Sequence, residues 1–311
     1  MPGPDDAAAL LDLVPGWTGR ARIVGPLAGG ITNRNFLVDV DGEPCVLRLP
    51  GKDTDLLLID RAVEHAAAQR AAHLGIAPEV VAFVPEAGSL VTRFVAGESL
   101  PPEHLATSPW LERAGETLRA FHESGPLPGA FDCFRVPARH HADARRRGVG
   151  IPAEYEDATD RAAAIEAAFA AHPEPRCPCH DDLLNANFLR DGDRLWLLDW
   201  EYAGMNDRYF DLGNLATNND FDAEAEVALV ETYFGAATPR RLARLRLMKI
   251  MSDFREAMWG VVQQGISTLD FDYRSYAAEH FDRLLRHAAD PGYGRLLDEA
   301  AQPDVPPATR A

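Results

Sequence analysis

Positive charge is scarce in this sequence. Its 311 residues include 31 lysines and arginines against 48 aspartates and glutamates, which gives a formal net charge of -17 at pH 7. Nucleic acids and anionic membranes are bound by basic surfaces, so we expect neither as a partner. The acidic balance is instead compatible with a cationic small-molecule substrate.

Long apolar runs and a cysteine framework are also missing. No stretch approaches the ~20 consecutive apolar residues that a membrane-spanning helix needs, and the acidic N-terminal segment does not resemble a secretion signal. The four cysteines are widely or awkwardly spaced, which predicts reduced thiols and a cytoplasmic protein. A single residue separates Cys177 from Cys179, which is closer than the usual zinc-binding cysteine pair, so we expect no zinc site there.

Two patterns of secondary structure divide the chain. The first hundred or so residues alternate short β-rich runs with turns, and an alanine-rich stretch from 58 to 74 among them is typical of a helix. From about residue 101 onward the pattern is mostly helical. We therefore predict an α+β, bilobal fold, with a small β-rich lobe over residues 1–96 and a larger, mostly helical lobe over residues 97–311. Residues 125–151 hold several glycines and prolines and are expected to form an extended loop.

The segment from residue 179 to 201 contains the most informative motif. It matches the order and spacing that kinase-type phosphoryl transfer uses, with the four matching side chains being His180, Asp182, Asn187 and Asp199. A tight-turn dipeptide, Asp191-Gly192, lies between two strand-like runs and predicts a β-hairpin. Antiparallel pairing then returns Asn187 and Asp199 to neighbouring positions at the open end of the hairpin.

These side chains have complementary chemistry. Asn187 and Asp199 offer the oxygen ligands that Mg²⁺ prefers, and Glu201 is expected on the same side of the strand as a further ligand. Asp182 is the candidate base that accepts or orients the proton of an attacking hydroxyl. His180 is expected to hold the loop through hydrogen bonds. The alternative is a group of solvated acidic residues beside a turn, the usual setting of aspartate and glutamate.

A second group of residues suits a nucleotide. A small-residue loop precedes a predicted strand, where its backbone amides can cover phosphates, and its candidate residues are Gly29, Gly30, Thr32 and Asn33. The chain has only two lysines, Lys52 and Lys249, and neither lies in the strand that follows. We therefore assign the phosphate contact to Arg48, with Glu64 on the neighbouring helix as its acidic partner.

Several segments together resemble the choline/ethanolamine kinase family, within the wider group that includes the aminoglycoside phosphotransferases. They are the Gly-Gly-Ile-Thr-Asn loop of residues 29–33, the arginine-bearing strand of residues 47–51, the Asp-Trp-Glu-Tyr segment of residues 199–202, the Phe-Asp-Leu-Gly-Asn segment of residues 210–214, and an aromatic block near the C-terminus. The resemblance spans most of residues 27–285. It implies a protein-kinase-like fold, ATP and Mg²⁺ as cofactors, and transfer of phosphate to the hydroxyl of a small amino alcohol.

The C-terminal block supplies the expected substrate pocket. A quaternary ammonium ion has no proton to donate and is best held by aromatic faces and nearby carboxylates. Helical spacing places Arg255, Trp259 and Gln263 on one face of a helix from about residue 239 to 266. Further pocket residues are Tyr202, Tyr273, Tyr276 and Glu256.

Two departures from the family pattern keep the acceptor open. Glu256 stands where the resemblance leads us to expect a second pocket tryptophan, and Asn218-Asn219 stand in place of a Glu-Trp pair. The acceptor is then choline, ethanolamine or a similar amino alcohol. The alternatives are an antibiotic or sugar phosphotransferase on the same fold and a nucleotide-binding pseudokinase, which the complete catalytic set disfavours. The oligomeric state stays open, a homodimer included.

Overall fold

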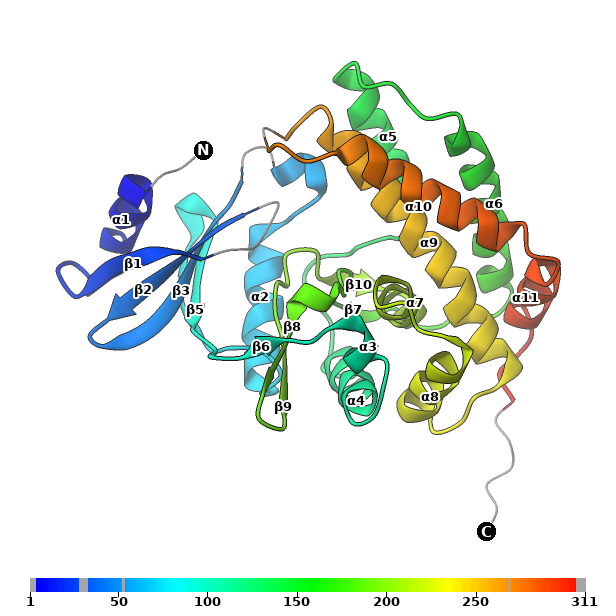
Figure 1. Cartoon of the computed structure of the whole chain (residues 1–311), viewed down its shortest axis with the longest axis horizontal. Coiled ribbons are helices and arrows are strands. Elements are labelled where there is room, and N and C mark those ends of the chain that lie inside the picture. The colour runs from blue at the N-terminus through cyan, green and yellow to red at the C-terminus, as the bar shows by residue number, and fades with distance from the viewer. Residues whose placement is uncertain (1–3, 28–32, 52–53, 268, 306–311) are drawn as a thin grey trace, which may run out of the picture.

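A five-stranded antiparallel sheet forms the N-terminal part of the structure, at one end of the molecule (Figure 1). The computed structural model describes residues 4–27, 33–51, 54–267 and 269–305. The strands follow the order β1-β2-β3-β5-β4. Their bounds are β1 Ala21–Leu27, β2 Arg34–Val40, β3 Glu43–Leu49, β4 Val80–Val84 and β5 Ser89–Arg93.

Side chains along β3 alternate between the two faces of the sheet. Cys45, Leu47 and Leu49 are buried on one face, where they join an apolar cluster with the helix α1, Pro4–Asp12. Successive residues of a strand point to opposite faces, so Arg48 points away from this cluster. Its partner there is Glu64, on the helix α2, Arg61–His73.

The helix α2 has clear start and stop signals. The Asp60 side chain caps its N-terminus by accepting hydrogen bonds from the backbone N–H groups of Ala62 and Val63. A left-handed Gly75, with φ of 74°, follows its C-terminus. The helix predicted over residues 58–74 is therefore present, with a short 3-10 turn, η1 Thr54–Leu57, before it.

The remainder of the chain is mostly helical. Its helices are α3 Pro102–Leu105, α4 Trp110–His122, α5 Val136–Arg146, α6 Glu154–Ala171, α7 Arg208–Asn218, α8 Ala223–Phe234, α9 Pro239–Gln263, α10 Tyr273–Ala288 and α11 Tyr293–Ala300. Short strands lie among them: β6 Glu98–Ser99, β7 Cys177–Cys179, β8 Phe188–Asp191, β9 Arg194–Leu197 and β10 Gly204–Asn206, with the 3-10 turns η2 Pro85–Ala87 and η3 Asn185–Asn187. The predicted α+β class is confirmed, whereas the division at residues 96 and 97 stays a prediction.

The long helix α9 organises this part of the molecule. It packs against α5, α7, α10 and α11, which surround it in Figure 1. Thr238 caps it by accepting from the Arg241 N–H, and Pro239 occupies its first turn. Its side chains are buried on nearly all sides, so polar residues along it need partners inside the protein. None of the helices in the described part of the chain combines the length and hydrophobicity needed to cross a membrane.

The expectation of an extended loop over residues 125–151 is wrong, because α5 occupies its middle. Pro137 lies in the first turn of this helix, where proline costs no hydrogen bond. The basic residues Arg145 and Arg146 lie in the last turn, where they interact favourably with the helix dipole. Burial of Val136, which joins the main apolar core, adds tertiary packing that local composition does not reveal.

Candidate active site

The predicted hairpin brings Asn187 and Asp199 together. The strands β8 and β9 pair antiparallel, from Phe188 opposite Leu197 to Asp191 opposite Arg194. At the open end the Leu198 N–H donates to the Asn187 carbonyl at 2.9 Å, which places the next residue, Asp199, beside Asn187.

The side chains at this end offer two kinds of oxygen atom. The Asn187 Nδ2 donates to the Asp182 carbonyl at 2.9 Å, which leaves the amide oxygen of Asn187 as the group that can ligate. The Asp199 carboxylate is 32% exposed. One amide oxygen and one accessible carboxylate form a donor set that suits Mg²⁺, which takes few protein ligands and completes its shell with water and phosphate.

His180 holds the loop that carries Asp182. Its Nε2 bonds to the Leu198 carbonyl at 2.8 Å, and its Nδ1 accepts from the Asp182 N–H at 3.2 Å. Burial lowers the pKa of His180, so the ring is neutral, with one donor and one acceptor nitrogen. Both ring nitrogens are used in positioning, and neither is free to transfer a proton.

Asp211, on α7, holds the same loop through its backbone. Its carboxylate accepts from the backbone N–H groups of His180 and Asp181, both at 2.8 Å, and from His122 Nε2 at 2.9 Å. Burial alone would raise the pKa of Asp211, but the hydrogen bond from His122 and its other donors outweigh that effect and lower the pKa. The Phe-Asp-Leu-Gly-Asn segment pointed to this residue, but sequence reasoning assigned it no role.

Two side-chain amides, one in α7 and one directly after it, hold the next residue of the same loop. Asn214 Oδ1 accepts from the Leu183 N–H at 2.5 Å, and Asn219 Nδ2 donates to the Leu183 carbonyl at 3.1 Å. Asn219 therefore has a structural partner in the position where a Glu-Trp pair was expected.

The Asp182 side chain is nearly buried at the centre of the site. Burial raises its pKa well above the ordinary range, and the carboxylates of Glu256 and Asp199 raise it further, while Arg255 opposes them. A carboxylate with a raised pKa accepts a proton more readily near neutral pH. Asp182 is thus a buried carboxylate with an increased proton affinity, 3.6 Å from the Arg255 guanidinium.

On the sheet side, Arg48 joins the two parts of the molecule. It forms ion pairs with Glu64 and with Asp199, so the predicted Arg48–Glu64 contact is present. Gly29, Gly30 and Thr32 lie outside the described residues.

Arg61 is a cation that sequence reasoning did not assign. It pairs with Glu64 at 2.7 Å and with Glu201 at 3.1 Å, and it donates to Asn33 Oδ1 at 3.2 Å. Asn33 Nδ2 also donates to Glu201, at 2.7 Å. The interactions found for Glu201 in the described chain therefore connect it to Arg61 and Asn33. These contacts join the Asn33 segment, α2 and the segment after the hairpin, and the role of Glu201 as a metal ligand stays a prediction.

The expected substrate residues come together around Trp259. Its Nε1 donates to the Tyr202 hydroxyl at 2.9 Å, and its ring lies 5.8 Å from the ring of Tyr273 and 5.7 Å from that of Tyr276. The Tyr276 hydroxyl donates to Glu256 at 2.7 Å. Gln263, one turn further along α9, lies beside a separate cavity of about 300 Å³ that Tyr273 also lines.

Arg255 is the cation at the centre of this cluster. Its Nη1 lies 2.5 Å from Glu256 and 3.6 Å from Asp182, and its guanidinium stacks 4.3 Å from the centre of the Tyr202 ring. Burial alone would lower the pKa of Arg255, but Glu256 and Asp182 reverse that effect and raise it. The helical spacing placed Arg255 on the pocket face, but the sequence did not reveal its partners.

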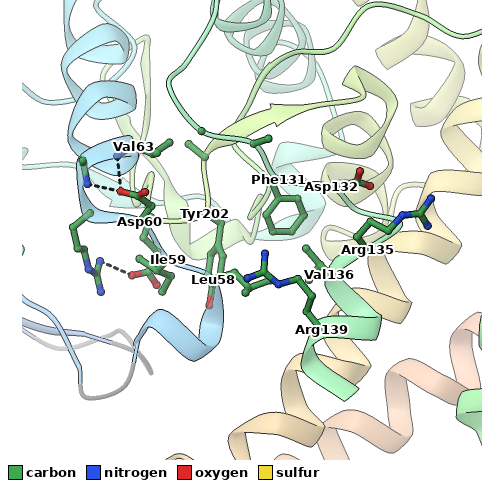
Figure 2. A pocket seen from close by; sticks show the side chains of 16 residues that line it. Leu58, Ile59, Asp60, Val63, Phe131, Asp132, Arg135, Val136, Arg139 and Tyr202 are labelled. Atoms are coloured by element: carbon green, nitrogen blue, oxygen red, sulfur yellow. Dashed lines mark hydrogen bonds and ion pairs between the residues drawn. The ribbon is translucent and has the colours of Figure 1, made fainter. Parts of the chain in front are cut away.

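A cavity of about 560 Å³ opens next to these residues. Its walls are the segment 58–63 before and within α2, residues 129–132, 135, 136 and 139, and residues 201–203. Figure 2 shows Phe131 and Tyr202 at this cavity and Arg139 extending from α5 toward Tyr202. The volume is sufficient for a small molecule.

Comparison with known proteins agrees with this geometry. The profile of a family described as "Phosphotransferase enzyme family" matches residues 23–247, which is most of the chain. A solved structure of a choline/ethanolamine kinase family protein from Mesorhizobium loti has 36% sequence identity and a TM-score of 0.79, over 96% of this chain and 98% of that one.

Two curated relatives are also similar along most of their length. Protein LicA from Haemophilus influenzae is 28% identical over 270 residues, covering 83% of this chain and 78% of that protein. Ethanolamine kinase 2 from Mus musculus is 27% identical over 314 residues, covering 91% of this chain and 80% of that protein. The kinase-like architecture predicted from the sequence is therefore confirmed.

Proposed function

The chain belongs to the phosphotransferase enzyme family, and we propose that it transfers a phosphoryl group from ATP to the hydroxyl of a small amino alcohol such as choline or ethanolamine. The observation that carries the proposal is that Asn187 bonds to the Asp182 backbone and lies beside Asp199 at the open end of one hairpin. Tyr202, three residues after Asp199, lines the cavity of about 560 Å³. The relatives with kinase names support the choice of donor and acceptor.

Each residue has a distinct part in this proposal. Asp182 orients the acceptor hydroxyl and takes its proton. Asn187 and Asp199 would hold Mg²⁺, which neutralises phosphate charge when bound. Arg48, now paired with Asp199, would turn its guanidinium toward the phosphates, and Glu64 would keep it in place.

The remaining predicted residues support these groups. Asn33, with Gly29, Gly30 and Thr32 before it, would lie over the nucleotide phosphates. Glu201 would act on the metal site through its ion pair with Arg61 in addition to any direct contact. Trp259, Tyr202, Tyr273, Tyr276, Glu256 and Gln263 would surround the acceptor. We propose a cytoplasmic location as well, in keeping with four free, buried cysteines.

The test is release of ADP with a panel of acceptors: choline, ethanolamine, aminoglycosides and sugars. We expect turnover with an amino alcohol, dependence on Mg²⁺, and loss of turnover in Asp182→Ala with binding of ATP retained. Turnover with aminoglycosides or sugars alone would replace the proposed acceptor class. No turnover with any acceptor, while ATP still binds, would identify a pseudokinase.

A further inference from the structure

The Tyr202 ring already has a cation packed against it. The guanidinium of Arg255 lies 4.3 Å from the centre of that ring, a cation–π contact inside the protein itself. Glu256, the nearest carboxylate of the cluster, is bonded to Arg255 through one oxygen and to Tyr276 through the other. A quaternary ammonium placed here would meet a second cation, and the Glu256 carboxylate is already paired.

Arg255 also has donors without acceptors. Its Nη1 serves Glu256 and faces Asp182, but Nε and Nη2 are buried and have no hydrogen-bond partner in the described part of the chain. Buried polar groups of this kind are expensive unless they are paired, and Arg255 is 2% exposed. They belong to the same guanidinium whose Nη1 lies 3.6 Å from the candidate base, so the natural partner for them is a group attached to the acceptor close to its reacting hydroxyl.

We propose that Arg255 determines acceptor specificity by binding a second oxygen of the acceptor, so that the preferred substrate is an amino alcohol with a further hydroxyl or carboxylate near the reacting hydroxyl. This inference rests on the proposed function and narrows it. Choline offers no such oxygen, and its quaternary ammonium, unlike a primary ammonium, has no N–H to donate to a carboxylate.

A matched series of acceptors tests the inference. Serinol is ethanolamine with an added hydroxymethyl group, serine is ethanolamine with an added carboxylate, and choline is ethanolamine with three N-methyl groups. We expect kcat/KM for serinol or serine to exceed that for ethanolamine by about tenfold or more, because a site built to bind an oxygen discriminates against the analogue that lacks it. Choline is expected below ethanolamine. Whether serinol or serine is better identifies the oxygen as a hydroxyl or a carboxylate.

Variants separate recognition from folding. Arg255→Met removes the donors, and the ratio of kcat/KM between the better oxygen-bearing acceptor and ethanolamine is expected to fall to about one. Arg255→Lys keeps a cation with donors and should recover part of the ratio. Arg246→Met is the matched control, because Arg246 lies on the same helix but pairs with Glu226, which Lys249 also binds. That control should retain the full ratio.

The outcomes distinguish this inference from the proposed function. If the wild type prefers choline or ethanolamine, or if Arg255→Met keeps the wild-type ratio, Arg255 does not select the acceptor although the enzyme is an amino-alcohol kinase. If no amino alcohol is turned over, the proposed function fails, and calorimetry with ADP and Mg²⁺ then decides the inference. The inference is supported if serinol or serine binds more weakly to Arg255→Met than to the wild type. Equal affinities of the two proteins overturn it.

Discussion

Substitution of Asp211 by asparagine tests how the catalytic loop is held. The carboxylate accepts three hydrogen bonds in a fully buried position: two from backbone N–H groups and one from His122. Asparagine can keep an oxygen facing His180 and His122, whose donors share Oδ2. Its NH₂ group then faces the Asp181 N–H, so that two donors oppose each other.

The size of the effect follows from those bonds. A hydrogen bond to a charged acceptor contributes about 1.5–3 kcal/mol, and an unsatisfied buried N–H costs about 1–3 kcal/mol. Both figures describe the loss of the same bond to the Asp181 N–H, so they are not added. We expect Asp211→Asn to lower the free energy of unfolding by about 3 kcal/mol. Because Asp181 directly precedes Asp182, the displaced loop should also lower kcat about 10- to 100-fold.

Asp222→Asn provides the matched control. Asp222 caps α8 by accepting from the Ala225 N–H, and asparagine caps helices about as well as aspartate. Urea unfolding followed by tryptophan fluorescence, together with ADP release, measures both effects. Equal unfolding midpoints for the two variants, or a destabilised Asp211→Asn with unchanged kcat, would refute the role assigned to Asp211.

Three further predictions concern stability and the pocket. Burial lowers the pKa of His140 to about 3, so the unfolded state alone takes up the proton below its ordinary pKa of about 6.5, and folding stability falls with pH from there. Between pH 7 and pH 5 the free energy of unfolding should therefore fall by roughly 2 kcal/mol less in His140→Leu than in the wild type, as measured in urea titrations. Parallel profiles of unfolding free energy against pH would contradict this. Trp259→Ala should raise the acceptor KM about tenfold and leave the ATP KM nearly unchanged; equal changes would remove Trp259 from the pocket. Gly213→Ala should cost about 1–3 kcal/mol in thermal unfolding, because its Cβ would meet the Met248 backbone at 2.7 Å; an unchanged midpoint would show that α7 and α9 can separate.

Local sequence was sufficient to predict a feature where the residues that form it lie close together in the chain. The tight turn at Gly192 and Asp193, directly after Asp191, fixes the β8–β9 register, and this register returns Asn187 to Asp199. Alternation along β3 separates Arg48 from the apolar face that Leu47 and Leu49 form. The same reasoning failed for α5, because its burial against α9 depends on residues more than a hundred positions away.

The amino-acid sequence by itself determined the catalytic segment, its kinase-like order and the α+β class, because turn residues, strand alternation and helix caps act over a few residues. Only the tertiary structure decided how the charges pair. Arg61 and Glu201 meet across 140 positions, and Arg255 packs on the ring of Tyr202, a residue of the segment after the hairpin. Such pairs form because buried charges must be matched by whatever the fold brings near, and no local pattern encodes that partner. The acceptor specificity that we propose depends on one of those pairings, at Arg255.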